Sequence, residues 1–531
     1  MFLLTAAEMA ELDRRTIDVV GLPGAVLMEN AGRGATRAIL ARFGRRPIPV
    51  AIVCGTGNNG GDGFVIARVL AGLGFRPRTA LLGTRERVRG DAAIHLRALQ
   101  GAGGALEEIV DVAAFESWTT SLGPCGLVID AVFGTGLRSE VAGLARAAIE
   151  WLDRQPAPVV AVDVPSGVDA STGRVMGTAP ACELTVTFAF PKLAHVLPPG
   201  CELAGDVRVV DIGIPGALLH GVEPKVRWLT GSEVARLVPF RPRQAHKGRF
   251  GHLLVVAGSR GLTGAATLAA LGALRAGAGL VTLGCPAAAA TASEKRAPEV
   301  MNAALPDGGR GFLGEDALDE VVRLSSAKQA VAVGPGLGRA AETRAFVRRL
   351  VTELELPMVV DADALIAIAD DPGVLRSAPA PRVLTPHPGE MAQLLGVGTA
   401  DVQGDRLGVA RRFAEQHNCT LVLKGADTVV AHPDGSASIN STGNPGMSTG
   451  GMGDVLTGIV GALLAQRMPP SQAAELGVYL HGAAGDRSAC EVGRSGLLAS
   501  DVADQVPRAR DDLDLGRSGA LPARIQWIEA P

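Results

Sequence analysis

The sequence has few aromatic residues and almost no net charge. Aromatic residues make up 3% of the 531 residues, Tyr479 is the single tyrosine, and the formal net charge is −3. Proteins that bind nucleic acid present a basic surface, and those that bind single strands also stack bases on aromatic side chains. We therefore expect no nucleic-acid partner, and we expect aliphatic side chains to fill the cores.

Disulfide patterns and membrane-spanning runs are also missing. The seven cysteines are widely spaced and form no C-x-x-C motif, which argues against a disulfide framework or a zinc knuckle and suits a cytoplasmic protein. The most apolar run, Leu262 to Leu274, holds about 13 residues and is too short to cross a bilayer. Glu8 and Glu11 interrupt the N-terminal stretch before an export signal could be completed. We expect a soluble chain with no membrane partner.

The length predicts more than one domain, because single hydrophobic cores stop growing beyond about 250–300 residues. Both halves alternate apolar runs, glycine or proline turns and helical segments, which predicts mostly parallel α/β sheets. A short segment near Trp228 separates two halves whose motifs differ. We place one α/β/α domain at residues 1–220 and a second at 221–531.

In the first half, a predicted buried strand at 50–54 leads into a glycine turn at 55–63 and then a helix. Three of these glycines satisfy G-x-G-x-x-G, but the strand at 79–84 lacks the acidic residue of a dinucleotide fingerprint. An ordinary hydride-transfer site is therefore not expected. Oxygen atoms suited to a monovalent cation or to ribose hydroxyls come from Asn58, Asn59 and Asp62.

Two later strands in this half end in aspartates, Asp130 and Asp163. Acids at the carboxyl ends of parallel strands converge on the crevice where such sheets bind ligands. Each aspartate could instead cap a helix, but together with Asn58 and Asn59 they favour a site. Lys192 lies at another strand end, where it either faces a phosphate or is an ordinary exposed lysine.

The first half resembles the NAD(P)H-hydrate epimerases in its motifs at 58–63, 130–136 and 163–168. The resemblance implies a Rossmann-like fold, the substrates NADHX and NADPHX, and K⁺ held by Asn59, Asp130 and Ser166. Because epimerisation needs an acid and a base near the ring, Asp163 is our candidate catalytic base. The residues implied to bind the hydrated nucleotide are Asn58, Asn59, Gly60, Gly61, Asp62, Gly134, Thr135, Gly136, Leu137, Arg138, Ser139, Glu140 and Asp163.

The second half contains a glycine-rich stretch from Asn444 to Gly458, with Asp454 where we expect a helix to begin at Val455. Four glycines, at 446, 450, 451 and 453, allow positive φ and close approach of a ligand, and a helix N-terminus favours an anion. A carboxylate beside a bound phosphate suits a catalytic base, although a plain helix N-cap is the alternative. We expect the helix N-terminus to lower the pKa of Asp454.

Three more residues of the second half are candidates. Lys424 and Thr428 lie at a strand–turn–strand and could contact phosphate, and no P-loop motif occurs. His387 lies in a proline- and glycine-bounded turn, where a structural role and a catalytic role are both open.

The second half resembles the ribokinase-like superfamily through Gly-x-Gly-Asp at 451–454, and within it the ADP-dependent NAD(P)H-hydrate dehydratases. The closer resemblance lies in motifs at 246–248, 385–390, 424–428, 444–447 and 495–501. It implies ADP as co-substrate, Mg²⁺ on the ADP oxygens, and Asp454 as the catalytic base. The residues implied to line the hydrate site are Ala266, Gly336, His387 and Asp454. Those implied to bind the adenine nucleotide are Lys424, Gly425, Ala426, Asp427, Thr428 and Gly453.

Together the two resemblances imply a bifunctional enzyme. The first domain equilibrates the two epimers, so that the stereospecific second domain can consume the whole pool of damaged coenzyme. We also expect a homo-oligomer. One alternative is an ATP-dependent kinase of a thiazole- or pyrimidine-type alcohol fused to a ligand-binding domain. A non-catalytic interaction module is a third possibility for the first half, but Asn58, Asp130 and Asp163 argue against it.

Overall fold

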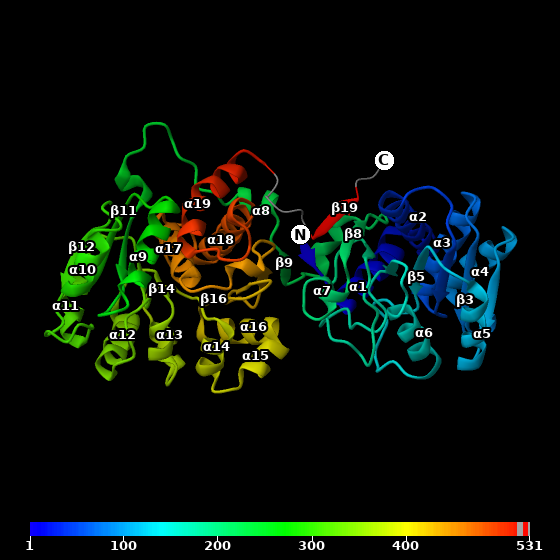
Figure 1. Cartoon of the computed structure of the whole chain (residues 1–531), viewed down its shortest axis with the longest axis horizontal. Coiled ribbons are helices and arrows are strands. Elements are labelled where there is room, and N and C mark those ends of the chain that lie inside the picture. Colours follow the sequence, from blue (N-terminus) through cyan, green and yellow to red (C-terminus); the bar gives the residue numbers. More distant parts are fainter. Residues whose placement is uncertain (518–523, 529–531) are drawn as a thin grey trace. The chain divides into compact units, whose positions relative to one another are not determined.

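The computed structural model describes residues 1–517 and 524–528, and the chain divides into two compact units (Figure 1). The first unit holds Phe2–Pro224 together with a strand from the far end of the chain, β19 (Ile525–Ile528), while the second holds Met1 and the described residues from Lys225 to Arg517. The expectation of two α/β domains is confirmed. The second domain predicted at 221–531 took in β19, which the structure gives to the first unit.

The first unit is built on a fully parallel sheet in which β19 is an edge strand. Alternate residues of the inner strand at Val50–Cys54 face opposite sides of the sheet. Ile52 packs in the core with the helices at 24–43 and 58–72, whereas Ala51 and Val53 pack with Phe115 and Trp118 on the other face. This gives three layers. The strand order is β19, β8 (Asp206–Val210), β7 (Leu184–Phe188), β6 (Val159–Val162), β5 (Leu127–Ala131), β2 (Val50–Cys54), β3 (Pro77–Leu82) and β4 (Leu106–Ile109).

The opening α-helix of this unit ends at Arg15 and is followed by a π-helical turn at Thr16–Val20. Thr5 begins it with a capping box to Glu8, which satisfies two otherwise unpaired backbone groups. The helices of the unit are α1 (Ala6–Arg15), α2 (Gly24–Phe43), α3 (Asn58–Gly72), α4 (Gly90–Gly101), α5 (Val112–Leu122), α6 (Gly143–Asp153) and α7 (Gly200–Leu203).

The segment predicted as a glycine turn at 55–63 is helical from Asn58 on. Its glycines serve close packing and not positive φ: a Cβ on Gly60 would lie 1.9 Å from the Gly55 carbonyl oxygen, and one on Gly63 would lie 2.6 Å from Cys54 Sγ. The absence of side chains thus lets α3 start directly against β2. This placement brings Asn59 and Asp62 to the carboxyl edge of the sheet.

The second unit has a mixed sheet that is parallel from β16 through β12 and antiparallel across β16, β17 and β18. From β9 onwards the order is β9 (Val226–Trp228), β18 (Ala437–Ile439), β17 (Val429–Ala431), β16 (Thr420–Leu423), β15 (Arg382–Leu384), β14 (Met358–Val360), β13 (Ala330–Val333), β10 (His252–Val256), β11 (Leu280–Pro286) and β12 (Met301–Leu305).

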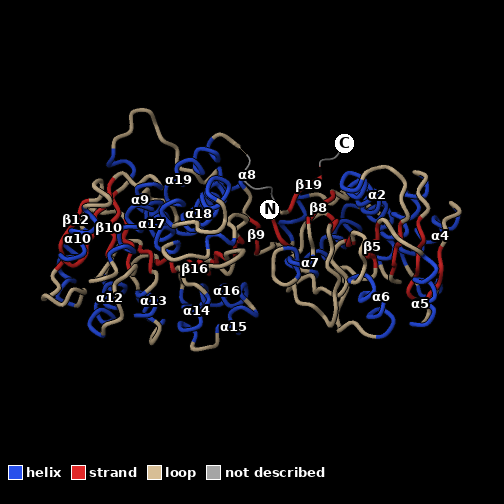
Figure 2. Tube along the Cα trace, viewed as in Figure 1, coloured by secondary structure: helices blue, strands red, loops and turns tan. Residues whose placement is uncertain are grey.

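Helices cover both faces of this sheet, as Figure 2 shows, with α9, α17, α18 and α19 on one side and α12 to α16 on the other. A Cβ on Gly458 would lie 1.9 Å from the Ala269 carbonyl oxygen, so α17 and α9 touch through small residues. The helices are α8 (Gly231–Ala235), α9 (Thr263–Arg275), α10 (Ala287–Glu294), α11 (Leu318–Ser325), α12 (Ala341–Glu353), α13 (Asp363–Ile368), α14 (Pro388–Leu395), α15 (Thr399–Gly404), α16 (Arg406–His417), α17 (Met452–Ala465), α18 (Pro470–Val492) and α19 (Ala499–Asp514).

All seven cysteines are free, and five of them are buried. Within the described ranges 1–517 and 524–528, no helix combines the length and the apolar surface needed to cross a membrane.

Candidate active sites

The first candidate site forms where β2, β5 and β6 end side by side. Asn59 and Asp163 both approach Gly134, where a Cβ would lie 2.9 Å from Asp163 Oδ2 and 3.2 Å from Asn59 Oδ1. The Asn59 side chain is buried, and neither its amide oxygen nor its amide nitrogen has a hydrogen-bond partner among the described residues. Buried polar groups are normally satisfied, so this pair of free amide atoms indicates a ligand position.

Asp163 is held in a strained conformation by a buried cation. Its φ is 70°, which non-glycine residues seldom adopt. Lys192 Nζ lies 2.6 Å from Asp163 Oδ1, and Thr187 Oγ1 donates to the same oxygen at 3.1 Å. Burial alone would raise the pKa of Asp163, but the Lys192 ammonium and these hydrogen bonds lower it below its ordinary value. Lys192 is therefore neither an exposed lysine nor free to meet a phosphate.

His195 joins the two chain segments that carry this pair. Its Nδ1 accepts from the Lys192 backbone N–H at 3.0 Å, so Nε2 carries the proton and donates to the Asp163 carbonyl oxygen at 2.9 Å. Burial and the Lys192 charge lower the pKa of His195 to about 4, which keeps the ring neutral. The imidazole thus fixes both backbones.

Two more carboxyl groups face the same cluster. Burial raises the pKa of Asp62 well above its ordinary value, and the nearby carboxylates of Asp163 and Asp13 raise it further. Burial likewise raises the pKa of Asp13 to about 6. Asp62 has a raised pKa and Asp163 a lowered one, so their environments push the two carboxyl groups towards opposite acid–base roles.

Asp130 and Ser166, both fully buried, are directly bonded at this edge. Ser166 Oγ lies 2.5 Å from Asp130 Oδ1, and the Ser166 backbone N–H donates to Oδ2 at 2.8 Å. Burial raises the pKa of Asp130 to about 6 against these bonds. Asp130 is therefore not a helix cap.

The remaining residues predicted for this site are spread out. Thr135 donates its N–H to Asp163 Oδ2 at 3.3 Å and belongs to the cluster. Asn58 is exposed at the start of α3, and the loop 136–140 is mostly exposed. Gly60 and Gly61 lie in α3 against the strand and α2.

The second candidate site forms at the start of α17, which begins at Met452, three residues before the expected start. Gly451 is the N-cap and has φ 90°, while Gly446, Gly450 and Gly453 do not have positive φ. Asp454 lies inside the first turn, so the N-cap interpretation of this residue is wrong. Its position still leaves the unpaired N–H groups of the helix facing the loop.

Lys424 and Asp361 meet beside this turn. Lys424 Nζ lies 2.9 Å from Asp361 Oδ1, and Thr457 Oγ1 of α17 donates to Asp361 Oδ2 at 2.7 Å. A Cβ on Gly453 would lie 3.1 Å from Lys424 Nζ, so the ammonium rests against the glycine loop. Burial opposes the charge, but the carboxylates of Asp361 and Glu390 raise the pKa of Lys424.

The pKa of Asp454 is raised to about 7, first by burial and then by the Asp361 carboxylate, with the Lys424 charge acting in the opposite direction. The expectation that the helix N-terminus lowers this pKa is wrong, because burial and a nearby like charge outweigh the helix dipole. A carboxylate with a pKa near neutral is a better general base than an ordinary aspartate.

His387 caps α14 with its side chain. Its Nδ1 accepts from the backbone N–H groups of Gly389 at 3.0 Å and Glu390 at 3.2 Å. Glu390 Oε2 in turn accepts from the His387 backbone N–H, which completes a reciprocal cap. The Nδ1 atom of the ring therefore has a structural role, as the cap of α14. The Nε2 atom faces outward and lies 3.6 Å from Glu390 Oε1.

The other predicted residues lie around this edge of the sheet. Thr428 is half-buried and donates to the Gly425 carbonyl oxygen, and Asp427 has φ 50° in the turn between them. Ala266 is buried in α9, and a Cβ on Gly336 would lie 2.6 Å from the Leu262 carbonyl oxygen. Gly336 therefore approaches the start of α9.

Family comparisons match both halves of the chain. The sequence profile described as NAD(P)H-hydrate dehydratase matches residues 253–508, and the profile described as YjeF-related protein N-terminus matches residues 24–194. The bifunctional NAD(P)H-hydrate repair enzyme Nnr of Moorella thermoacetica is 44% identical over 519 residues, which is 97% of each chain.

This chain belongs to the bifunctional NAD(P)H-hydrate repair enzymes. The Escherichia coli protein of the same name is 36% identical over 501 residues, covering 93% of this chain and 91% of that protein. Among solved structures, the ADP/ATP-dependent NAD(P)H-hydrate dehydratase of Bacillus subtilis, co-crystallised with ATP and Mg²⁺, is 32% identical, with a TM-score of 0.48, and covers 54% of this chain and 99% of its own. The resemblance seen in both halves of the sequence is confirmed at the level of the family.

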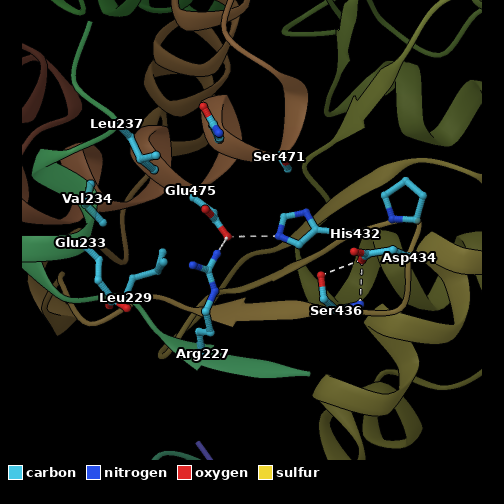
Figure 3. A pocket seen from close by; sticks show the side chains of 12 residues that line it. Arg227, Leu229, Glu233, Val234, Leu237, His432, Asp434, Ser436, Ser471 and Glu475 are labelled. Carbon is cyan, nitrogen blue, oxygen red and sulfur yellow. Dashed lines mark hydrogen bonds and ion pairs between the residues drawn. The ribbon is translucent and has the colours of Figure 1, made fainter. Parts of the chain in front are cut away.

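This repair-enzyme chain also has a cavity of about 420 Å³ within the second unit, away from the residues predicted for either site. Figure 3 shows Arg227 and His432 directed at Glu475. Glu475 Oε1 accepts from Arg227 at 2.8 Å, from Ser438 Oγ at 2.5 Å and from His432 Nε2 at 3.2 Å. These bonds tie β9, β17 and β18 to α18.

Asp361, Glu390 and His195 contribute to the two sites although no role was predicted for them from the sequence. Asp361 directly follows a buried strand, so the argument that selected Asp130 and Asp163 would also have selected it. Glu390 ends the motif at 385–390, but its contact with Lys424, at 3.8 Å, depends on how β15 and β16 pair. No sequence signal marks His195, which acts through two backbone contacts.

Proposed function

We propose that this chain repairs hydrated nicotinamide coenzymes in two steps. The first unit interconverts the R and S epimers of NADHX and NADPHX. The second unit uses ADP to convert the S epimer to NADH or NADPH, and releases AMP and phosphate. The observation that carries the proposal is the Asp454 carboxylate, with its near-neutral pKa, in the first turn of α17 beside the Lys424 ammonium.

In the first unit, we assign Asp163, whose pKa is lowered, as the base and Asp62, whose pKa is raised, as the acid. The Lys192 ammonium and the His195 clamp hold Asp163 ionised and in place. An ionised carboxylate also stabilises positive charge on the ring nitrogen if the hydroxyl leaves and returns. The free Asn59 amide and the 134–140 loop would contact the nucleotide.

In the second unit, the hydroxyl oxygen of the hydrated ring attacks the β-phosphorus of ADP, and Asp454 takes the proton of that hydroxyl. The new O–P bond replaces the bond to the bridging oxygen, and AMP leaves. Backbone N–H groups at the start of α17 bind the transferred phosphoryl group. Phosphate then leaves with the C–O bonding electrons, the ring nitrogen supplies its electron pair, and the neighbouring ring carbon loses a proton, which restores the dihydropyridine.

The donor atoms fit the expected cations. Amide, carboxylate and hydroxyl oxygens of Asn59, Asp130 and Ser166 suit a hard cation such as K⁺, and the Asn59 oxygen has no protein partner among the described residues. Across residues 1–517 and 524–528, no group of three or more His, Cys, Asp or Glu side chains could hold a metal ion. Mg²⁺ would therefore bind mainly through the phosphate oxygens of ADP, where it neutralises negative charge.

The test is to incubate pure R hydrate with the full chain and ADP, and to follow the near-ultraviolet absorbance of the reduced coenzyme. We expect complete recovery, which needs both sites. The Asp454→Asn variant should recover no reduced coenzyme but should still interconvert the epimers. The Asp163→Asn variant should convert added S hydrate to the reduced coenzyme and leave R hydrate unchanged. ATP-dependent phosphorylation of a thiazole or pyrimidine alcohol, without coenzyme recovery, would refute the proposal.

The free cysteines suit a cytoplasmic repair enzyme, which is the location we infer, and we also infer that it acts as a homo-oligomer. Sedimentation velocity on the purified chain tests the latter, and a monomer at micromolar concentration would contradict it.

A further inference from the structure

The loop that precedes the glycine stretch of the second site rests directly on helix α18. Two glycines one turn apart on α18, Gly482 and Gly485, form the surface that the loop packs against. A Cβ on Gly482 would lie 2.3 Å from Thr442 Oγ1, and one on Gly485 would lie 2.3 Å from Met447 Sδ. Distances below 3.0 Å are closer than a real Cβ tolerates. The close atoms at Gly482 include the Thr442 backbone, so only glycine at 482 lets the loop at 442–447 lie this close to the helix, whereas Gly485 makes room for the flexible Met447 side chain.

Asp486 follows these glycines and is bonded to the loop. Its Oδ2 accepts from the Gly443 backbone N–H at 3.0 Å, and its Oδ1 accepts from Asn444 Nδ2 at 2.9 Å. Asn444 Oδ1 accepts in turn from the Gly446 backbone N–H at 3.0 Å. A continuous chain of hydrogen bonds therefore runs from α18 through Asn444 into the turn that leads to the glycine stretch.

Asp486 is 6% exposed, and within residues 1–517 and 524–528 its carboxylate forms no ion pair, although the Arg494 charge acts on it at longer range. Burial raises its pKa, and the N–H groups of Gly443 and Asn444 counter that effect. Leaving a buried carboxylate without donors is unfavourable, because the group has given up its hydrogen bonds to water. Release of the loop from α18 is therefore unfavourable, and the carboxyl group keeps the loop in one conformation.

We propose that Asp486 is a positioning residue for the dehydratase reaction, which fixes the Asn444 loop on α18 and thereby the orientation of the Gly450–Asp454 turn. Asp486 does not touch the reacting atoms. This inference rests on the proposed function of the second unit and extends it to a residue on another helix. His481, five residues earlier on α18, lies near the start of α17, because its ring is close to the Met452 backbone and the Lys424 charge.

The test uses Asp486→Asn in the full chain. This change keeps the shape but turns an N–H₂ group towards a donor, so one of the two bonds is lost. We expect faster hydrogen–deuterium exchange at 443–447, by about tenfold, and a kcat/KM for ADP reduced by about 10- to 100-fold, which corresponds to the cost of one unsatisfied buried group. Epimerase activity should stay unchanged and reports that the chain is folded.

The exchanged pair Asp486→Asn with Asn444→Asp provides a rescue. It restores the bond between the two side chains with donor and acceptor reversed, and each side chain still accepts its backbone N–H. We expect the double variant to recover slow exchange and most of the kcat/KM. The matched control is Asp512→Asn on α19, where the carboxylate pairs with Arg487 and does not contact the loop. That control should leave both readouts unchanged.

Wild-type exchange in Asp486→Asn, or reduced activity without faster exchange at 443–447, would overturn the assignment, as would a double variant no better than the single one. Exchange is measured without substrate. It therefore tests the role of Asp486 even if the wild-type chain shows no dehydratase activity, a result that would refute the proposed function alone.

Discussion

Lys192 and Asp163 form a buried ion pair in the first unit, with Nζ 2.6 Å from Oδ1 and side chains that are 1% and 11% exposed. Lys192→Met should abolish epimerase activity and destabilise the first unit by about 3–5 kcal/mol, because it leaves a buried carboxylate without its counter-ion. Urea unfolding and the interconversion of R and S hydrates measure the two effects.

The double variant Lys192→Met with Asp163→Asn separates these effects. Removing both charges should recover much of the stability but none of the activity. Equal stability of Lys192→Met and wild type would show that the pair is not buried in solution.

The dehydratase reaction should depend on pH through Asp454. This carboxyl group must be ionised to act as a base, and its pKa is raised to about 7. The kcat/KM should therefore fall about tenfold for each pH unit below about 7, and level off above it. Asp361→Asn should shift this fall in kcat/KM, the acid limb of the pH profile, to lower pH, because the Asp361 carboxylate raises the pKa of Asp454.

Thr457→Val is the matched control for Asp361→Asn, because it removes a hydrogen bond to Asp361 but no charge. The limb should then stay close to that of the wild type. A profile that is flat between pH 5.5 and 8 would exclude Asp454 as the base.

The sequence was sufficient to predict which strand ends carry the first site. Asp130 and Asp163 follow strands that are neighbours in a parallel sheet, so the rule that acids converge at carboxyl ends held without tertiary information. The strain could not be predicted, since L-residues disfavour positive φ. Asp163, Ala362 and Asp427 adopt it at the two candidate sites, at a cost of about 1–3 kcal/mol each.

Longer-range relations were also out of reach. The pKa of Asp454 depends on Asp361, which lies far away in the sequence, and a rule based on the local helix gave the wrong sign. In the same way, β19 pairs in parallel with β8 although some three hundred residues separate them. Periodicity identifies a strand but not its partner.

Strand β19 should stabilise the first unit and not the second. Ile525 is 4% exposed and pairs with Val207 at the edge of the first sheet. Ile525→Ala should lower the free energy of unfolding of the first unit by about 2–4 kcal/mol. Differential scanning calorimetry, with epimerase and dehydratase activities measured after heating, assigns the loss. An earlier loss of dehydratase activity would contradict the placement of β19.

Glu475 should make the second unit sensitive to acid. Burial opposes its ionisation, but hydrogen bonds from His432 and Ser438 and the Arg227 charge hold its pKa below the ordinary value. A carboxyl group with a lowered folded-state pKa contributes stability that is present above its unfolded pKa of about 4.3 and is lost as pH falls through the folded pKa. Glu475→Gln should remove this contribution. Between pH 6 and pH 3, unfolding free energies of wild type should therefore fall more steeply than those of the variant.

Glu353→Gln, which breaks only the exposed pair with Arg349, should change stability by less than about 1 kcal/mol at any pH. Parallel acid limbs for wild type and Glu475→Gln would mean that the Glu475 carboxylate gains nothing from Arg227, His432 and Ser438 on folding.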